Sequence, residues 1–275
     1  MKILIIGASS YVGARIYTDL KDKFSVVGTY YTNKLFPELE MLDIRSKVDV
    51  ENFVKNIKPD IIIHIAANAS DTWCEQNPGQ ALAINQDGTK NIVDAANNIH
   101  AKVIFISSLL IINAESIYGR TKIEGENFVK RTTEGYIILR PSLIIGFSPN
   151  TTNDRPFNRL LKNIAEKTPA IYDTSWKFQP TWLKHISEII ETVIEKNILN
   201  EIIPICVPEI KTKYEIAKDI LTNFNINVIP NDKKDSTPDL LDDLNKLKEL
   251  KLPVYTYSQM IAGIQEEIQN YLNTK

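Results

Sequence analysis

A tyrosine and a lysine four residues apart, Tyr118 and Lys122, have the types and spacing that most clearly allow chemistry. Residues at i and i+4 lie on one face of a helix, so the phenol and the ammonium would be neighbours. A nearby ammonium, together with the positive charge that a nicotinamide hydride donor carries once oxidised, would stabilise a tyrosinate and lower the pKa of the phenol. The phenol could then protonate a carbonyl oxygen as a hydride reaches its carbon. Ser108, at the end of the preceding strand, would hydrogen-bond to the same oxygen. The three residues therefore predict chemistry on a carbonyl group; the alternative is a chance Tyr–Lys pair on a helix surface.

A hydride donor needs a binding site, and the first residues of the chain predict one for a dinucleotide. An apolar strand leads into Gly7-Ala-Ser-Ser-Tyr-Val-Gly13 and then into a helix. Gly7 permits a tight turn after the strand, and Gly13 lets the first helical turn pack against the sheet. Ser10 replaces the middle glycine of this pattern but is small. The free N–H groups at the helix start, those of Tyr11 and Val12, would face the pyrophosphate; the alternative is a strand-to-helix turn without a ligand.

The end of the second predicted strand indicates which dinucleotide is preferred. The stretch Thr29-Tyr-Tyr-Thr-Asn-Lys34 has no Asp or Glu to accept the adenosine ribose hydroxyls. An acidic residue there would favour NAD and repel a 2′-phosphate, so its absence favours NADP(H), with NAD as the alternative. Tyr30 would line this end of the site, and Lys34, together with Arg15, would hold the phosphate. The alternative for Lys34 is a solvated loop cation.

Asp43 and Ile44 follow what should be a further short strand, the third along the chain and placed between Lys34 and Asp43, and they would complete the adenosine end of the site. A carboxylate at this position can accept a hydrogen bond from the adenine amino group; the alternative is that Asp43 caps the helix that follows. At the other end of the dinucleotide, Lys122 would also hold the nicotinamide ribose, with Ser107 and Tyr118 beside it.

The elements that must position these residues alternate along the first half of the chain. Short β-branched runs alternate with helical patterns, which is typical of successive βαβ units and predicts an α/β fold with a Rossmann-type doubly wound parallel sheet. The predicted strands are Lys2–Ile6, Ser25–Thr29, Ile61–Ile65, Lys102–Ser107 and Gly135–Leu139. The predicted helices are Val12–Lys21, Val48–Asn56, Gln80–Ile99 and Ser116–Arg131.

Beyond Pro141 the pattern changes to helical segments separated by stretches rich in Pro, Asn, Asp and Thr. We expect residues 1–146 to form the dinucleotide-binding domain and residues 147–275 to be mainly a smaller mixed α/β substrate lobe, with some later segments returning to the first domain. The lobe would pack on the carboxyl ends of the strands, where ligands of open α/β sheets bind. Its predicted helices are Asn158–Glu166, Ile186–Lys196, Lys213–Asn223 and Gln259–Tyr271.

The composition excludes several other classes of protein. Of 275 residues, 43% are hydrophobic and 24% charged, with a formal net charge of −2, so a globular protein without general attraction to nucleic acid or anionic membranes is expected. The spacing of Cys74 and Cys206 predicts neither a disulfide nor a metal site. His64, inside an apolar strand, is expected to be a packed core histidine. Without a signal-like start or an apolar run of about 18 residues, we expect a cytoplasmic protein.

Longer strings of the sequence resemble the extended short-chain dehydrogenases, and among them the dTDP-4-dehydrorhamnose reductase-like branch. The strings are GASSYVG at 7–13, LDIRS at 42–46, HIAANAS, WCEQNP and AINQDGTKN between 64 and 91, ISS at 106–108, YGRTKIEGE at 118–126, LRPSLIIG at 139–146 and QPTW at 179–182. The resemblance covers nearly the whole chain and is strongest up to Gly146. It implies an NADPH-dependent reductase for the 4-keto group of a nucleotide-activated deoxysugar, and it makes a homodimer a further expectation.

The resemblance also implies roles for residues outside these motifs. Ala66 and Ala67 would line the path of the adenosine ribose and pyrophosphate, and Asn85 would lie near the nicotinamide. Arg140 and Pro141 would close around the nicotinamide carboxamide and lead into the substrate lobe. The implied substrate-binding residues are Trp73, Ser108, Ser142, Trp176 and Gln179; for Trp176 the alternative is a core position.

One departure from the family concerns the segment between Ser108 and Tyr118. Reductases of this branch carry a DYVFDG-like segment that borders the substrate, whereas here only Leu109–Ile117 separates the serine from the tyrosine. The departure keeps two alternatives to the reductase open. One is a catalytically inactive, NADP-binding regulatory subunit of another enzyme, and the other is an NAD-dependent sugar-nucleotide epimerase or dehydratase.

Overall fold

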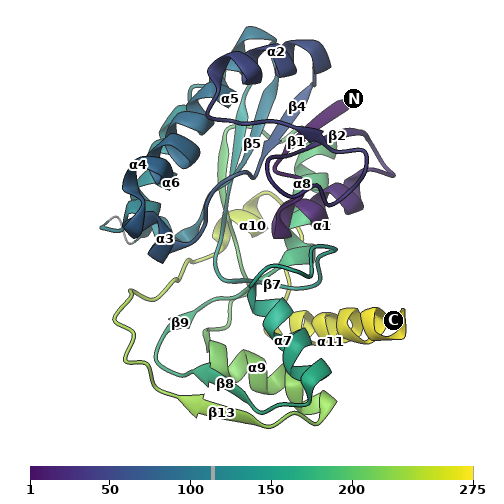
Figure 1. Ribbon diagram of the computed structural model, residues 1–275, viewed down its shortest axis with the longest axis vertical. Helices are drawn as coiled ribbons and strands as arrows, with labels where there is room; N and C mark the ends of the chain where they lie inside the picture. Colours follow the sequence, from purple (N-terminus) through teal and green to yellow (C-terminus); the bar gives the residue numbers. More distant parts are fainter. Residues whose placement is uncertain (113–114, 275) are drawn as a thin grey trace.

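The centre of the protein is a parallel sheet, seen in a computed structural model that describes residues 1–112 and 115–274 (Figure 1). Its strands are β1 Lys2–Ile6, β2 Ser25–Tyr30, β3 Glu40–Met41, β4 Ile61–His64, β5 Lys102–Ile106, β6 Tyr136–Pro141 and β11 Glu201–Ile205. They lie in the order β11-β6-β5-β4-β1-β2-β3. The chain order reverses between β1 and β4, and ligands of such sheets bind at this switch point, beyond the carboxyl ends of the strands.

Both faces of the sheet are covered by helices, as the apolar strands require. Side chains alternate along a strand, so Ile3 and Ile5 of β1 pack in one core cluster while Leu4 and Ile6 pack in the other. Helices α1 and α8 cover the first face, and α2, α5 and α6 cover the second (Figure 1). Their bounds are α1 Tyr11–Leu20, α8 Leu183–Glu195, α2 Lys47–Ile57, α5 Gly88–Asn98 and α6 Ile117–Val129.

The helix expected over Gln80–Ile99 is present but is interrupted. It starts as α4 (Pro78–Ala81), continues as a π-helical turn, η1 (Leu82–Asp87), and ends as α5. Two short helices flank the same end of the sheet, α3 (Asp71–Gln76) and the 3-10 helix η2 (Leu109–Ile112). The π turn carries the buried Asn85, and such turns often mark functional sites.

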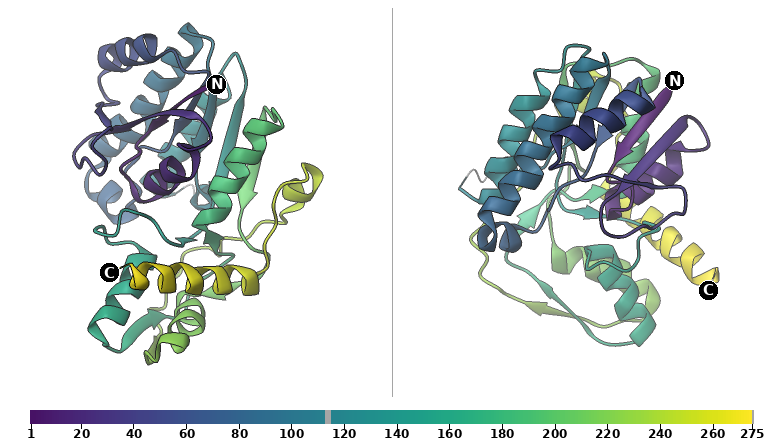
Figure 2. Two further views of the ribbon diagram at one scale, coloured as in Figure 1. Left: turned by 90° about the vertical axis from the view of Figure 1, so that its right-hand side faces the viewer. Right: turned by 45° about the horizontal axis from the view of Figure 1, so that its top comes forward.

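A smaller lobe lies beyond the carboxyl edge of the sheet (Figure 1). Its short strands pair as β8 with β13, β7 with β10 and β9 with β12, and α11 lies across it (Figure 2). The helices are α7 Pro156–Glu166, α9 Lys213–Leu221, η3 Thr222–Phe224, α10 Asn245–Glu249 and α11 Tyr257–Asn273. The strands are β7 Ile144–Ile145, β8 Ala170–Asp173, β9 Lys177–Phe178, β10 Thr181–Trp182, β12 Lys211–Thr212 and β13 Val228–Asn231.

Two segments from the second half of the chain lie in the first domain rather than in the lobe. Strand β11 pairs in parallel with the edge of β6, and α8 packs against α1. In the ranges 1–112 and 115–274, no helix has the length and apolar character needed to cross a membrane.

Candidate active site

Two adjoining cavities lie where the carboxyl ends of the central strands meet the lobe. The inner cavity, of about 200 Å³, has Ser108, Tyr118 and Lys122 in its walls. The outer cavity, of about 830 Å³, is bordered by the loops that follow β1, β2 and β4. Four residues contribute to the walls of both cavities and define the junction between them: Ser10, Ala67, Ala69 and Arg155.

The loop between β1 and α1 has the backbone that the glycine pattern predicts. Gly7 has a φ of +92°, and a Cβ there would lie 2.8 Å from the Ala66 nitrogen. A Cβ on Gly13 would lie 2.1 Å from the Gly7 carbonyl oxygen, so both positions need glycine. Ser10 Oγ accepts a hydrogen bond of 3.0 Å from the Gly13 amide and caps α1.

This capping bond leaves the start of α1 with donors that point at the cavity. Tyr11 and Val12 line the inner cavity, and within the described ranges their amide groups have no acceptor. The first N–H groups of a helix have no partner in the helix itself and carry its positive dipole end. This edge of the cavity can therefore receive an anion.

The structure brings Ser108, Tyr118 and Lys122 together despite the short segment between them. Tyr118 and Lys122 are almost fully buried, 5% and 3% exposed, and Ser108 lies near enough to the Tyr118 hydroxyl to lower its pKa. Lys122 Nζ donates to the Ile106 carbonyl at 2.9 Å and lies 6.0 Å from the centre of the Tyr118 ring. The middle of the segment, residues 113–114, lies outside the described residues.

Burial dominates the acidity of this pair. It raises the pKa of Tyr118 to about 12, although Ser108 and the positive charge of Arg155 act in the opposite direction. It lowers the pKa of Lys122 to about 8, with the Glu126 carboxylate opposing. In the chain alone, desolvation of a tyrosinate outweighs its attraction to nearby cations, and the lowered Tyr118 pKa stays a prediction for the cofactor-bound protein. That expectation also included the charge of an oxidised nicotinamide, which is not part of the chain.

A buried carboxylate, Glu126, lies under the inner cavity. It accepts two hydrogen bonds from the Arg140 guanidinium, at 2.9 and 2.6 Å, and one of 2.7 Å from Ser107 Oγ. Ser107 and Pro141 line the inner cavity, but Arg140 lines neither cavity among the described walls. Its side chain binds Glu126 instead of facing a ligand, contrary to the implied role beside the carboxamide.

At the outer cavity, Tyr30, Lys34, Asp43 and Ile44 all contribute to the wall, together with Gly7, Ala66 and Ala67. Arg45, which the motifs did not single out, lies there too and pairs with Asp43 at 2.7 Å. Helix α2 is capped by Ser46, so the alternative of Asp43 as the helix cap is wrong. Besides Arg155 at the junction, the described wall of the outer cavity thus has two cations, Lys34 and Arg45, and one carboxylate, Asp43.

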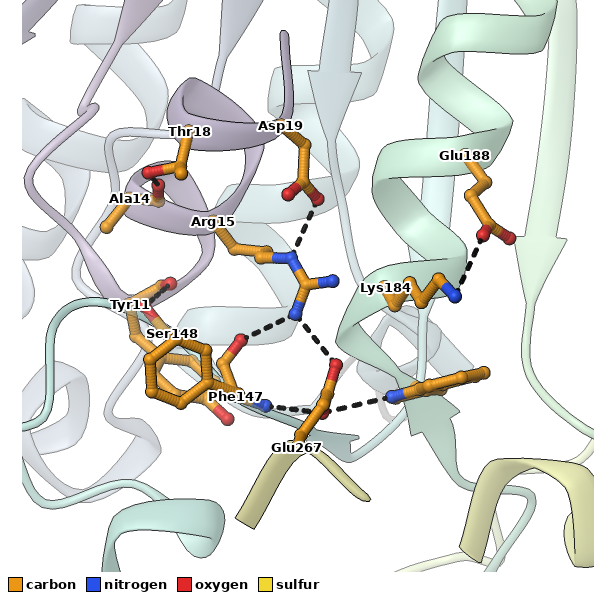
Figure 3. A network of polar contacts seen from close by, with 11 residues as sticks. Tyr11, Ala14, Arg15, Thr18, Asp19, Phe147, Ser148, Lys184, Glu188 and Glu267 are labelled. Carbon is orange, nitrogen blue, oxygen red and sulfur yellow. Dashed lines mark hydrogen bonds and ion pairs between the residues drawn. The ribbon is translucent and has the colours of Figure 1, made fainter. Parts of the chain in front are cut away.

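Arg15 does not reach the outer cavity, contrary to its expected role as a phosphate ligand. Its guanidinium pairs with Asp19 at 2.7 Å and with Glu267 at 2.8 Å, and it also donates to the Phe147 carbonyl at 3.0 Å (Figure 3). Asp19 belongs to α1 itself, whereas Glu267 belongs to α11 and Phe147 to the segment that follows β7. The hydrophilic side of α1 therefore carries a structural ion pair and not a cofactor contact.

The residues expected on the substrate side divide into two groups. Ser142 and Trp176 line the inner cavity, and the buried Ser142 Oγ has no hydrogen-bond partner in the described ranges. Trp73 and Gln179 are absent from the walls that the described residues form; Gln179 is buried and accepts a hydrogen bond of 2.6 Å from the Asp242 amide. Neither residue therefore borders the two cavities as the described residues define them, and their roles in substrate binding stay predictions.

Two polar residues of the core, Asn85 and His64, form hydrogen bonds with other residues of the protein. Asn85 hydrogen-bonds to the Asn68 amide at 2.8 Å and to Thr121 Oγ1 at 3.2 Å, and it lines neither cavity as the described walls define them. His64 is fully buried, bonded to Thr89 Oγ1 at 2.9 Å, and burial lowers its pKa to about 3. It is the packed core histidine that the sequence predicts.

Four wall residues that sequence reasoning missed come from the segment between β7 and α7. They are Asn150, Thr152, Asn153 and Arg155. The Arg155-Pro156 pair at the start of α7 is a local sign of a helix start, but no local pattern brings this segment to the first loop of the chain. Only the fold could reveal these residues.

Comparisons with known proteins agree with this architecture. A family model described as the RmlD substrate binding domain matches residues 1–240. The chain is 26% identical over 250 residues to methionine adenosyltransferase 2 subunit beta of Xenopus laevis, covering 82% of this chain and 72% of that protein. It is 26% identical over 160 residues to a dTDP-4-dehydrorhamnose reductase of Sinorhizobium fredii, covering 50% of each. The crystal structure of dTDP-4-dehydrorhamnose reductase from Bacillus anthracis in complex with NADP is similar with a TM-score of 0.84 at 21% identity, covering 98% of this chain and 99% of that one.

Proposed function

Because this chain belongs to the RmlD substrate binding domain family, we propose that it is an NADPH-dependent reductase of the 4-keto group of a nucleotide-activated deoxysugar. The observation that carries the proposal is the convergence of Ser108, Tyr118 and Lys122 in one buried cavity. That cavity adjoins a larger one at the switch point of a doubly wound sheet, which is where such folds bind dinucleotides. Family membership supports NAD(P)-dependent oxidoreductase chemistry, and the finer substrate assignment is ours.

The residues of the two cavities have the groups needed to bind NADPH. Gly7 lets the chain turn sharply after β1, and the amides of Tyr11 and Val12 would donate to the pyrophosphate. Lys34 and Arg45 in the outer wall would hold a 2′-phosphate. The Bacillus anthracis reductase structure with NADP supports the same choice, with NAD as a second cofactor. When bound, NADPH supplies the hydride that reduces the carbonyl carbon.

The chain's own residues would supply the proton. Ser108 and the Tyr118 hydroxyl would hydrogen-bond to the carbonyl oxygen, and the Tyr118 proton would pass to that oxygen as it becomes an alcohol. Since the pKa of Lys122 is about 8 and that of Tyr118 about 12, a tyrosinate left at Tyr118 is the stronger base. The ammonium would therefore return a proton to it, and solvent would restore the ammonium.

The substrate class is supported by the walls of the inner cavity. Trp176 offers an aromatic surface for a base or sugar face, and the unpartnered Ser142 Oγ offers a buried hydrogen-bonding group for a sugar hydroxyl. The reductase from Sinorhizobium fredii among the relatives supports a deoxysugar bearing a 4-keto group.

The test is a fluorescence titration with NADPH and with NADH, followed by addition of dTDP- and UDP-linked 4-keto-6-deoxyhexoses. We expect tighter binding of NADPH and its oxidation when one of the sugars is added. Tyr118→Phe should lower turnover by about 10²- to 10⁴-fold, because the general acid is lost, while NADPH binding stays intact. Unchanged turnover in this variant, or failure of every ketosugar to oxidise NADPH, contradicts the proposal.

A second candidate is a cofactor-binding subunit that does not turn over a ketosugar. Its specific support is the match over 82% of this chain to methionine adenosyltransferase 2 subunit beta, together with the short segment after Ser108. The chain would be mixed with a methionine adenosyltransferase catalytic subunit and analysed by size-exclusion chromatography. A stable complex without ketosugar turnover favours the subunit; turnover without a complex excludes it.

A further inference from the structure

A segment of the lobe lies along the first helix of the sheet domain. We call residues 146–155, between β7 and α7, the strap; in Figure 1 it passes beside the start of α1. Its second half contributes four residues to the wall of the outer cavity: Asn150, Thr152, Asn153 and Arg155. The lobe thus supplies part of the site in which we propose that the dinucleotide binds.

The strap is fastened to the loop that carries the glycine pattern. Ser148 Oγ donates to the Tyr11 carbonyl at 2.6 Å, and Asn150 Nδ2 donates to the Ser9 carbonyl at 2.7 Å. The Tyr11 hydroxyl in turn donates to the Gly146 carbonyl. Since all three bonds are buried or part-buried, the strap has a fixed position relative to the start of α1.

A second anchor fixes the strap from the other side. The Glu267 carboxylate accepts from the Phe147 amide at 2.8 Å and pairs with Arg15 at 2.8 Å, while Arg15 donates to the Phe147 carbonyl (Figure 3). Both polar groups of the Phe147 backbone are thereby bound. The strap is held between α1 and α11, and it brings Arg155 to the junction of the two cavities.

Arg155 is the charged residue among the four that form the junction. Across residues 1–112 and 115–274, its guanidinium has no ion pair or hydrogen bond, whereas Arg15, Arg45, Arg140 and Arg159 are all paired with carboxylates. Its positive charge lowers the pKa of both Tyr118 and Tyr11, against the effect of their burial. The charge therefore acts on both sides of the junction. It also lowers the pKa of the neighbouring Asp154, but that carboxylate forms its ion pair with Arg159 and not with Arg155.

The opposite wall of the junction lacks a cation of its own. Ser10 supplies a hydroxyl that already caps α1, and the donors left on α1 are the neutral amides of Tyr11 and Val12. A pyrophosphate carries two negative charges, and planar guanidinium groups bind such oxygens with paired, charge-assisted hydrogen bonds. Arg155, in the wall of the same junction, offers the positive charge that these neutral amides lack.

We propose that Arg155 binds the pyrophosphate of the dinucleotide from the lobe side, so that the phosphates are held between α1 and the strap. The inference rests on the proposed function, since it takes the outer cavity as the NADPH site. It adds a ligand that comes from the lobe and not from the glycine loop. Cofactor binding would then also link the lobe to the sheet domain.

The experiment measures dissociation constants at fixed ionic strength for wild type, Arg155→Ala and Arg155→Lys. We expect Arg155→Ala to bind NADPH about 10- to 100-fold more weakly, the loss typical of one charge-assisted contact. The fragment 2′-phospho-ADP-ribose, which retains both phosphates, should lose affinity equally. Adenosine 2′-monophosphate, which lacks the pyrophosphate, should bind to Arg155→Ala as it does to wild type. Arg155→Lys should recover part of the affinity, because it keeps the charge without the paired donors.

Arg131→Ala is the matched control, because Arg131 lies at the end of α6 over the Phe128 ring and its loss changes the net charge equally. It should bind NADPH as wild type does. An unchanged NADPH affinity in Arg155→Ala overturns the inference. If the NADPH affinity is unchanged and the KM of a sugar nucleotide rises, the inference is overturned as well, because Arg155 would then bind the diphosphate of the substrate. If Arg155→Ala binds NADPH more weakly but wild type turns over no ketosugar, the inference about Arg155 is supported and the proposed reductase function is contradicted. A wild type that does not bind NADPH overturns both.

Discussion

At the scale of single residues, Lys122 is a cation that the fold removes almost completely from water. The residue is 3% exposed, and its ammonium lies over the Phe105 ring at 4.6 Å with the Ile106 carbonyl as its acceptor. Burial lowers the pKa of Lys122 from an ordinary 10.5 to about 8. The folded protein therefore holds this proton less tightly than the unfolded chain does, and the protonated lysine costs stability at neutral pH.

This linkage gives a prediction for Lys122→Met. Between pH 8 and pH 10.5 the unfolded chain binds the lysine proton and the folded protein does not, so the free energy of unfolding of wild type should rise with pH relative to the variant. The slope is at most about 1.4 kcal/mol per pH unit. Urea unfolding of both proteins at a series of pH values measures it. A difference between the two proteins that stays constant from pH 7 to pH 10 contradicts the lowered pKa.

At the scale of elements, the turn between β1 and α1 depends on a close approach that only glycine permits. A Cβ on Gly13 would lie 2.1 Å from the Gly7 carbonyl oxygen, and a backbone atom cannot move aside without opening the loop. We expect Gly13→Ala to lower the free energy of unfolding by about 1 to 3 kcal/mol, and to weaken NADPH binding because the α1 amides shift. Calorimetry and the fluorescence titration measure the two effects.

Gly79→Ala provides the control for this prediction. Gly79 lies in α4, and a Cβ there meets nothing within 4 Å. Alanine in a helix is about 0.5 to 1 kcal/mol more favourable than glycine, so this variant should be as stable as wild type or more so, with unchanged NADPH affinity. If Gly13→Ala and Gly79→Ala have the same free energy of unfolding and the same NADPH affinity, the close approach at Gly13 does not require glycine.

The elements also show what the sequence could predict. Strand β1 has the predicted bounds, and α1, α2 and α6 lie within two residues of them, because apolar runs and helical periods are local signals. The π turn at Leu82–Asp87 was missed, since Asn85 reaches Asn68 and Thr121 only in the folded protein. The β8–β13 pair was missed as well, because its partners lie far apart in the sequence.

In the candidate site too, residues placed by local sequence patterns were predicted and residues placed by long-range contacts were not. Ser108, Tyr118, Lys122 and the glycine loop were found because their spacing along the chain reflects one turn or one helix face. Arg155 was missed because a lobe segment brings it to that loop. Arg15 was assigned to a phosphate from its place on α1, yet its partner Glu267 comes from the other end of the chain. Long-range partners of charged side chains are the part of the site that local patterns do not predict.

At the scale of the whole molecule, the sheet domain and the lobe are joined by the group around Glu267. This carboxylate contacts Arg15 of α1, the Phe147 amide of the strap and, at 3.3 Å, the indole Nε1 of Trp182 (Figure 3). The Glu267 and Arg15 side chains are only 14% and 13% exposed. Removal of Glu267 would leave the part-buried Arg15 with one carboxylate, Asp19, and would leave the Phe147 amide and the Trp182 indole without their acceptor, which is costly.

We therefore expect Glu267→Ala to lower the free energy of unfolding by about 3 kcal/mol, equivalent to a fall in Tm of about 6 to 12 °C for a protein of this size. Glu51→Ala, which removes the exposed partner of Lys47 at 3.6 Å, should cost less than about 1 kcal/mol. Because Glu267 also holds the strap, its loss should weaken NADPH binding at temperatures where the variant is still folded, whereas Glu51→Ala should not. Thermal unfolding and NADPH titration of both variants separate the two roles. A large loss of stability with unchanged NADPH affinity would show that Glu267 joins the lobe to the sheet domain without positioning the strap, and the cofactor site would then be complete without this anchor.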